Sequence, residues 1–330
     1  LLQYTVEHRG SDLHVKVGSP PHVRVDGHLS PAPFDPVTPA DAEGIAFAIL
    51  PPDRAEEFNA SCDADFALSV SGLGRFRVNV FRQRGSVGLV LRRVLPGMPS
   101  FDTLGLPGSV PRLADELSGI VLVTGPAGSG RTTTLASMVD HINETRAVNI
   151  VTIEDPIEVL HPDKLAIVNQ RELGTDTRDY PSALRRVLRQ DPDVIVIGEI
   201  ADADTMWASL SAASTGHLVL STMQTGRVGE TITRIVDFFP PFQQRQVRQT
   251  LSACLRGIVS QRLLERADGR GRVPAVEVAV NTARVLDHIL DIDARPEKLD
   301  EVMAEGEYHG MQTFDQSLFG LYKNLSLIHI

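Results

Sequence analysis

The order of apolar and polar positions divides the chain into two parts with different predicted folds. In the first part, the stretch DLHVKVGSPPHVRVDGHL (residues 12–29) alternates apolar and polar residues on both sides of a Gly-Ser-Pro-Pro turn, a pattern typical of paired strands. A second alternating pair lies at 75–81 and 87–94, and residues 40–59 fit a helix broken at a Pro-Pro pair. These elements predict a small mixed α+β domain at residues 1–97.

From Gly119 onward, the apolar residues form continuous runs instead of alternating with polar ones. Such runs are expected for strands buried on both faces of a sheet, and stretches with helical character separate them. This order predicts right-handed crossovers and a parallel sheet flanked by helices, an α/β fold. The runs lie at 119–125, 148–154, 193–199 and 217–223, and the helical stretches at 132–145, 181–190, 202–214, 241–256 and from 282 onward.

A stretch rich in proline and glycine separates the two parts. We expect a linker at 98–112 and the α/β domain at 113–330. The last residues, LSLIHI, fit neither a helix end nor an amphipathic pattern and resemble translated adapter sequence. We therefore expect the natural chain to end near Asn324.

Composition and charge narrow the class of protein. A hydrophobic content of 42% over 330 residues allows a full core in each domain. The formal net charge of −10 argues against binding of nucleic acid or of an acidic membrane by the surface as a whole. The two cysteines match no metal spacing, and no apolar run reaches membrane-spanning length. These features predict a cytoplasmic protein.

The most informative motif is GPAGSGRTTT, at residues 125–134. It follows a predicted strand and precedes a predicted helix, which is the context of a loop that binds nucleotide phosphates. In this hypothesis the loop binds ATP, and the hydroxyl of Thr132 binds Mg²⁺. The usual pattern has lysine where this chain has Arg131. The predicted nucleotide-binding residues are Gly125, Pro126, Ala127, Gly128, Ser129, Gly130, Arg131, Thr132 and Thr133.

Acidic residues follow two of the other predicted strands. Glu199 ends the run DVIVIGE and is the candidate for orienting the attacking water or contacting Mg²⁺. Glu154, Asp155 and Glu158 follow the run at 148–154, and the carboxyl ends of parallel strands meet where ligands bind. We therefore predict Mg²⁺ ligands among Thr132, Glu154, Asp155 and Glu199. Glu158 is a second catalytic candidate.

The predicted N-terminal domain holds a basic stretch, with six arginines and no acidic residue from Arg75 to Arg93. Strand alternation places Arg75 and Arg77 on one face of a strand and apolar residues on the other. Such a face suits phosphate or a carboxylate surface on another subunit. Nucleic acid is a rival ligand, but few aromatic residues interleave and the chain is acidic. A solvated hairpin remains open as well.

Together these motifs resemble the secretion-superfamily motor ATPases, and among them the PilT-type ATPases that retract type IV pili. The resemblance covers nearly all of residues 1–320. SDLHVKVGSPPHVRVDG and GRFRVNVF are similar to the family's PAS-like N-terminal domain, and MQTFDQSL to its C-terminal helical segment. VTIEDPIE is similar to its Asp box, DPDVIVIGE to its Walker B box and TGHLVLSTMQT to its His box. The resemblance implies that the second domain is RecA-like.

The resemblance also implies a function and partners. It implies a homo-hexameric ring that hydrolyses ATP with Mg²⁺ to power pilus retraction and twitching motility. It implies ATP between the two domains, with N-terminal arginines reaching the nucleotide; Arg77, Arg84 and Arg92 are the nearest matches. His217 would sense the γ-phosphate. The implied partner is a pilus platform protein of the inner membrane, which would hold the cytoplasmic motor at the membrane.

Three departures from the family's pattern lie in the motifs that the resemblance assigns to ATP hydrolysis. Arg131 replaces the lysine of the phosphate loop, and Ala201 stands at the arginine position after the Walker B box. Gln224 replaces the second histidine of the His box. Two alternatives to the motor therefore stay open. One is a nucleotide-binding regulatory or structural subunit with little turnover that assembles with an intact paralogue, and the other is a pilus-assembly or type II secretion ATPase.

Overall fold

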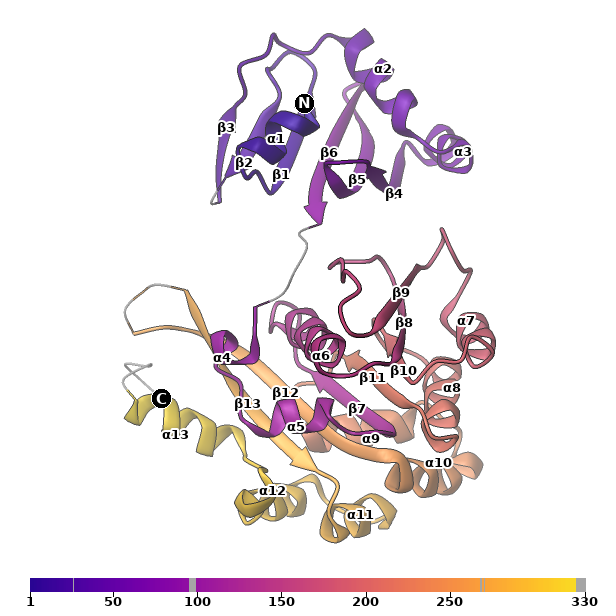
Figure 1. The fold of residues 1–330 in the computed structure, drawn as a ribbon, viewed down its shortest axis with the longest axis vertical. Helices are drawn as coiled ribbons and strands as arrows, with labels where there is room; N and C mark the ends of the chain where they lie inside the picture. Colours follow the sequence, from indigo (N-terminus) through magenta and orange to yellow (C-terminus); the bar gives the residue numbers. More distant parts are fainter. Residues whose placement is uncertain (26, 95–98, 268, 270, 325–330) are drawn as a thin grey trace. The chain divides into compact units, whose positions relative to one another are not determined.

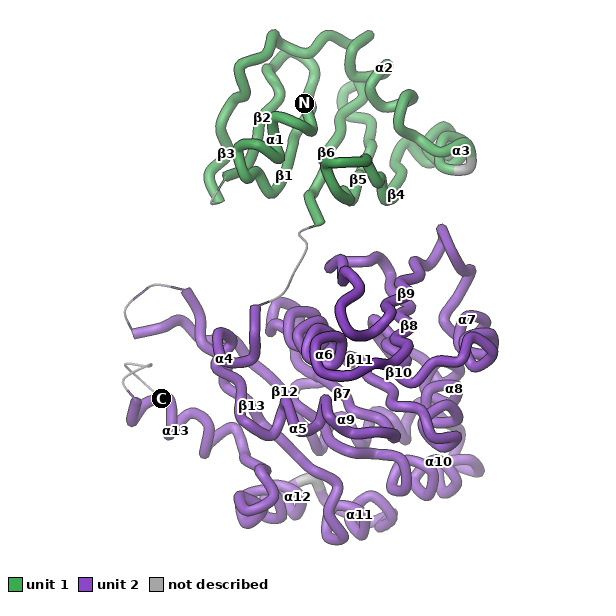
Figure 2. Tube along the Cα trace, in the orientation of Figure 1, with its two compact units in different colours: residues 1–96 green, residues 97–330 purple. Residues whose placement is uncertain are grey.

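The computed structural model describes residues 1–25, 27–94, 99–267, 269 and 271–324. The chain divides into two compact units, Leu1–Pro96 and Gly97–Ile330 (Figure 2). Among the described residues, the structure holds no helix with both the length and the apolar character that a bilayer-spanning segment requires. The expectation about LSLIHI falls on residues 325–330, which lie outside the described residues.

The first unit is an antiparallel sheet with helices packed against it (Figure 1). Its strands lie in the order β3-β2-β1-β6-β5-β4, and each pair of neighbours is antiparallel. A strand-rich α+β fold was expected here and is confirmed. The strands are β1 (Asp12–Lys16), β2 (His22–Val25), β3 (His28–Pro31), β4 (Asp63–Val70), β5 (Gly74–Gln83) and β6 (Ser86–Val94), and the helices are α1 (Leu2–Glu7), α2 (Pro39–Ile49) and α3 (Pro52–Ser61).

Side-chain alternation decides which face of this sheet carries the core. Val78 of β5 and Leu89 of β6 belong to one buried cluster with Phe58 of α3. Thr38 caps the start of α2 with a capping box, and the expected break at the Pro-Pro pair separates α2 from α3. The apolar pattern did not predict α1 or β4.

The second unit is a mostly parallel sheet with helices on both faces (Figure 1). In the described part of the chain its strands lie in the order β13-β12-β7-β11-β10-β8-β9, and β13 alone runs antiparallel to its neighbour. The expected α/β fold is confirmed, and β9, β12 and β13 extend it. The strands are β7 (Gly119–Thr124), β8 (Asn149–Glu154), β9 (Ile167–Glu172), β10 (Val194–Ile197), β11 (Leu218–Met223), β12 (Leu255–Glu265) and β13 (Arg272–Val280).

Helices lie at the predicted stretches 132–145, 181–190, 202–214 and 241–256, but the helix at Val228–Asp237 was not predicted. The stretch 98–112, predicted as a linker, contains α4 and most of α5, and Val110 and Leu113 of α5 are buried in the core of this unit. The sequence-based domain boundaries otherwise stay a prediction. The helices are α4 (Phe101–Leu104), α5 (Ser109–Ala114), α6 (Arg131–Thr145), α7 (Tyr180–Val187), α8 (Ala203–Ser214), α9 (Val228–Asp237), α10 (Pro241–Cys254), α11 (Ala283–Leu290), α12 (Pro296–Ala304) and α13 (Phe314–Lys323).

The parallel register of β7, β11, β10 and β8 brings the segments that follow these four strands to the same edge of the sheet. Every residue of β7 is buried, with Ile120 in the core cluster on one face and Val121 in the cluster on the other. Ile197 of β10 pairs with Ile153 of β8 on one side and with Ser221 of β11 on the other. The residues that follow these strands therefore lie close together.

Candidate nucleotide site

The loop from Gly125 to Gly130 connects the end of β7 to the start of α6. Gly128 and Gly130 have φ angles of +75° and +92°, in the left-handed region that favours glycine. No described side chain caps α6, and the N–H groups of a helix's first turn have no partner within the helix. Backbone N–H groups in this arrangement form a site for an anion.

The surroundings of the loop leave room for a phosphate group. No described atom lies within 4 Å of the position that a Cβ would take at Gly128. The hydroxyl of Ser129 is buried, and it has no hydrogen-bond partner in the part of the chain that the structure describes. An open cradle with an unpaired hydroxyl at the start of a helix fits a nucleotide phosphate.

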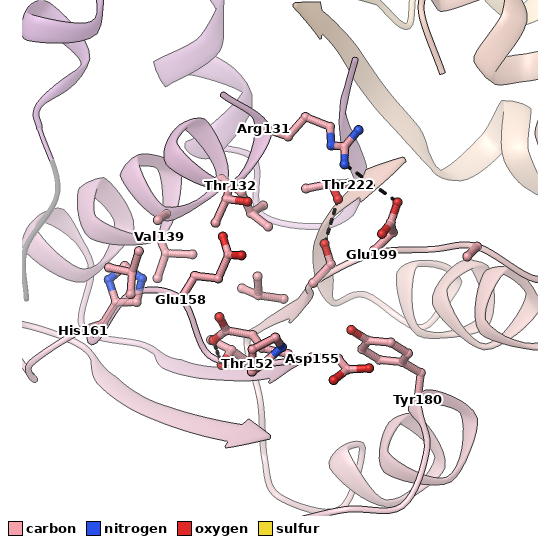
Figure 3. Close-up of a pocket in the computed structure, with 18 of the residues that line it drawn as sticks. Arg131, Thr132, Val139, Thr152, Asp155, Glu158, His161, Tyr180, Glu199 and Thr222 are labelled. Atoms are coloured by element: carbon pink, nitrogen blue, oxygen red, sulfur yellow. Dashed lines mark hydrogen bonds and ion pairs between the residues drawn. The ribbon is translucent and has the colours of Figure 1, made fainter. Parts of the chain in front are cut away.

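Arg131 contacts its own loop. Its Nη1 donates a hydrogen bond to the carbonyl oxygen of Gly125, and its Nη2 lies 3.9 Å from Oε1 of Glu199 (Figure 3). The side chain of Arg131 is 14% exposed and that of Glu199 is 35% exposed. A partly exposed pair at this distance is weak by itself. The planar guanidinium nevertheless reaches both groups at once, so Arg131 links the phosphate loop to the strand end that carries Glu199.

A pocket of about 350 Å³ lies beside the loop (Figure 3). The start of α6, the ends of β8 and β10, and the segment 155–161 form its walls. The Glu158 side chain points from that segment toward Thr132. The sequence-predicted residues that line the pocket are Arg131, Thr132, Glu154, Asp155, Glu158 and Glu199.

Glu154 is the most enclosed of the acidic residues in this pocket. Its Oε1 accepts hydrogen bonds from Oγ1 of Thr152 at 2.6 Å and from Nε2 of Gln170 at 3.0 Å. Burial raises the pKa of Glu154 above its usual value and outweighs these hydrogen bonds. Glu154 is therefore a poorer source of negative charge than an ordinary carboxylate.

The predicted Mg²⁺ ligands line the same pocket, but their side chains are not arranged as a complete coordination shell. Thr132, Glu154, Asp155 and Glu199 all line it. Among the described residues, no group of three or more His, Cys, Asp or Glu side chains is arranged to hold a metal ion. Mg²⁺ in nucleotide sites is usually held by one or two protein groups together with phosphates and water, and these residues suit that kind of binding.

Tyr180 is a pocket residue that the sequence analysis missed. It begins α7, and a Cβ at Gly198 would lie 3.0 Å from its hydroxyl oxygen. Burial, followed by the charges of Asp155 and Glu154, raises the pKa of Tyr180. The phenol therefore stays protonated and able to donate a hydrogen bond. No motif marked it, because its position follows from where α7 starts in space.

His217 does not line the pocket within one chain, and its predicted contact with the γ-phosphate stays a prediction. This residue precedes β11, and its carbonyl oxygen accepts a hydrogen bond from the N–H of Gly119 at the start of β7. Its ring Nδ1 lies 3.1 Å from Oγ1 of Thr215. The phosphate loop follows the other end of β7, about 20 Å away for strands of six residues. Within one chain, His217 is therefore remote from the pocket, and Gln224 occupies the near end of β11.

The predicted N-terminal arginines all lie in the first unit. Arg77 pairs across the sheet with Arg92, and Arg84 lies in the turn between β5 and β6 with a φ of +50°. Arg92 donates from Nε to Oδ1 of the buried Asp12 at 2.7 Å. Arg92 thus has a structural partner within its own sheet. That these arginines reach the nucleotide stays a prediction.

The contact between Arg92 and Asp12 should stabilise the first unit. Burial alone would raise the pKa of Asp12, but hydrogen bonds from Arg92 and Ser11 outweigh it and hold the pKa below its usual value. Asp12→Asn should therefore lower the opening free energy of β1 by about 1–2 kcal/mol at pH 7. Hydrogen exchange of peptides from β1 measures this loss.

The pH dependence gives a second readout of the same contact. A carboxylate with a lowered pKa in the folded state contributes stability above its unfolded pKa of about 3.9, and the contribution disappears as the pH falls through the folded value. The difference between Asp12→Asn and the parent should shrink below about pH 4. Asp63→Asn, which changes an exposed carboxylate of the same sheet, is the control. Equal exchange in both variants would contradict the prediction.

Comparison with known proteins agrees with this geometry. Residues 75–307 match the family described as type II/IV secretion system protein. The chain belongs to that family. Over nearly their full lengths, the chain is also similar to the type IV pilus retraction ATPase PilT of Pseudomonas aeruginosa. It is 39% identical to PilT over 321 residues, which are 97% of this chain and 92% of the relative.

Further members of the secretion family show the same likeness. The type IV pilus ATPase PilU of Pseudomonas aeruginosa is 38% identical over 322 residues, 98% of this chain and 84% of the relative. A crystal structure of the pilus retraction motor PilT with bound ADP superimposes with a TM-score of 0.89 at 43% identity, covering 98% of this chain and 92% of the other. The resemblance to PilT-type ATPases that the motifs indicated is confirmed.

Proposed function

We propose that this chain is an ATPase that powers retraction of type IV pili and twitching motility. One observation carries the proposal: Arg131 and Thr132, which directly follow the phosphate loop, line a single pocket together with Glu199 at the carboxyl edge of the sheet. Relatives that match this chain along nearly their whole length are named as pilus retraction and pilus ATPases. The loop geometry supports a nucleotide as the ligand. A solved relative that holds ADP supports ATP as that nucleotide.

In this proposal the loop holds the β-phosphate. The N–H groups of the phosphate loop and of the first turn of α6 donate to phosphate oxygens, and the helix dipole favours the negative charge of the phosphate. Thr132 and Glu199 would hold Mg²⁺, which neutralises charge on the phosphates when bound. Because these contacts are mostly main-chain, nucleotide binding should depend little on the side chain at position 131.

Glu199 and Arg131 would act on the reacting end of the nucleotide. The carboxylate of Glu199 orients the attacking water, and its charge favours the partial transfer of the water's proton. The guanidinium of Arg131 is the nearest cation to that carboxylate in the pocket. It can stabilise charge on the transferred phosphoryl group only after its contact with Glu199 has changed.

A paired measurement tests the proposal. The purified full chain is titrated with MgATP, and steady-state phosphate release is measured on the same sample. Binding with turnover supports the motor ATPase. Binding without turnover supports a regulatory or structural subunit that works with an intact paralogue, and the engagement of Arg131 by Gly125 and Glu199 specifically favours that alternative. Absence of binding would refute both.

The other alternative is an ATPase of pilus assembly or type II secretion. The extent of the similarity speaks against it. The chain is 39% identical to PilT over 97% of its residues, but 33% identical to a type II secretion system protein E of Xanthomonas campestris over 81% of them. The retraction-type proposal therefore accounts for more of the similarity.

We expect the chain to form a homo-hexameric ring. The PilT-type resemblance implies this ring, and a ring with repeated heterologous interfaces closes without leaving exposed ends. Light scattering at micromolar concentration with MgADP should give the mass of a hexamer. A monomer at every concentration would contradict the expectation.

The proposed location follows from the proposed function. A retraction motor works in the cytoplasm, beside the inner membrane, through a pilus platform protein. The formal net charge of −10 speaks against an additional role in binding nucleic acid.

A further inference from the structure

A buried amide on β12 touches the underside of the phosphate loop. Gln261 is 2% exposed and Ser129 is 3% exposed. Nε2 of Gln261 donates a hydrogen bond of 3.1 Å to the carbonyl oxygen of Ser129. The strand register explains the contact, because Ser260 pairs with Thr124 and the next residue of β12 therefore lies beside the start of the loop.

The glycines of the loop lie directly against this residue. A Cβ at Gly125 would lie 2.4 Å from the backbone oxygen of Gln261, and one at Gly130 would lie 3.2 Å from its Nε2. Both glycines have positive φ angles as well. Any larger residue at Gly125 would push the loop away from β12. The loop is thus fitted to β12 at Gln261.

This hydrogen bond fixes the direction of one peptide group in the loop. In a planar trans peptide, the C=O of Ser129 and the N–H of Gly130 point in opposite directions. When Gln261 holds the carbonyl oxygen on the β12 side, the N–H of Gly130 points to the other side, away from β12. A carbonyl without this partner would be buried and unpaired, which is costly, so the peptide would turn or the loop would shift.

We propose that Gln261 is a positioning residue for nucleotide binding, which orients the Gly130 N–H toward the β-phosphate. The inference rests on the proposed function, and it assigns a role to a residue that no nucleotide-binding motif marks. Gln261 acts through the loop and does not touch the nucleotide. The Oε1 of Gln261 has no hydrogen-bond partner among the described residues, so the contact with Ser129 is its principal polar interaction there.

Asn281, which follows β13 and contacts the start of β12, is a matched control. It also donates its amide to main-chain carbonyl oxygens, those of Ser252 at 2.8 Å and Leu255 at 2.9 Å. Its Oδ1 also lacks a partner within the described residues. Asn281→Leu therefore removes the same kind of interaction from the sheet without touching the phosphate loop.

The test compares Gln261→Met with Asn281→Leu in the full chain. MgADP affinity is measured by calorimetry well below the melting temperature of each variant. Gln261→Met should weaken MgADP binding by about tenfold, because a misdirected donor loses its phosphate contact. The MgADP affinity of Asn281→Leu should stay within about twofold of that of the parent, although its melting temperature falls about as much as that of Gln261→Met. If Gln261→Met does not fold, Gln261→Asn, whose amide is one methylene too short to reach Ser129, should show the same loss.

The outcomes separate this inference from the proposed function. Unchanged affinity in Gln261→Met, with normal binding by the parent, overturns the positioning role and leaves the ATPase proposal standing. Equal weakening in Asn281→Leu also overturns it, because a general loosening of the sheet would then explain the loss. A parent chain that binds no MgADP overturns both.

Discussion

Glu199→Gln should lower the rate of ATP hydrolysis by at least about 100-fold and leave ATP binding within about threefold of the parent. The amide keeps the size and polarity of the side chain, but it cannot accept the proton of the attacking water. Because the water is activated only in the transition state, the loss falls on kcat and spares the ground-state contacts of the loop. Single-turnover phosphate release and a separate ATP titration measure the two effects.

Glu158→Gln is the companion variant for this prediction. Glu158 lines the same pocket and points toward Thr132, so it is the rival for the same role (Figure 3). We expect a smaller loss of kcat in Glu158→Gln than in Glu199→Gln. If Glu199→Gln hydrolyses ATP as fast as the parent while Glu158→Gln does not, the catalytic carboxylate is Glu158.

The parts of the fold that the sequence predicted are those with a strong hydrophobic pattern. β7, β8, β10 and β11 are buried on both faces, so their apolar runs identified them. β9 was missed because it is an edge strand with a polar sequence. Side chains accept hydrogen bonds from N–H groups on its open edge; for example, Oδ1 of Asp163 accepts one from the N–H of Val168. An edge strand of this kind carries little hydrophobic signal.

The strands β12 and β13 were missed for a different reason. Gln261 and Glu277 are polar but fully enclosed, so they interrupt the apolar pattern in both strands. Oε1 of Glu277 accepts a hydrogen bond from the N–H of Val228 at the start of α9. Burial raises the pKa of Glu277. Buried polar groups of this kind are determined by partners far away in the sequence, which no local pattern reveals.

The sequence could predict those parts of the candidate site that lie at the carboxyl ends of the parallel strands. The loop, Glu154 and Glu199 were placed correctly at one edge, because parallel strands bring their carboxyl ends together. His217 was assigned from a motif that spans all of β11, and motif membership does not say which end of a strand faces the ligand. Nor could spacing show that Arg131 donates to the carbonyl of Gly125.

Arg131→Lys should raise kcat by about tenfold, equivalent to about 1.4 kcal/mol of transition-state stabilisation, with a smaller change in ATP affinity. The guanidinium reaches the carbonyl of Gly125 and the carboxylate of Glu199 at once, whereas an ammonium is a compact charge without a fork. Lysine should therefore release Glu199 to orient water and place its charge on the phosphoryl group. ATP binding depends mainly on the backbone of the loop, so it should change little.

Arg146→Lys is the matched control for this substitution. Arg146 lies at the other end of α6 and also donates its Nη1 to a main-chain carbonyl oxygen, that of Glu116 at 3.1 Å. It does not line the pocket, so kcat should stay unchanged. An unchanged or lower kcat in Arg131→Lys would mean that the loop has adapted to arginine and that this is an ordinary motor. If turnover stays undetectable in Arg131→Lys, Ala201 and Gln224 contribute to the loss, and the regulatory subunit becomes the better account.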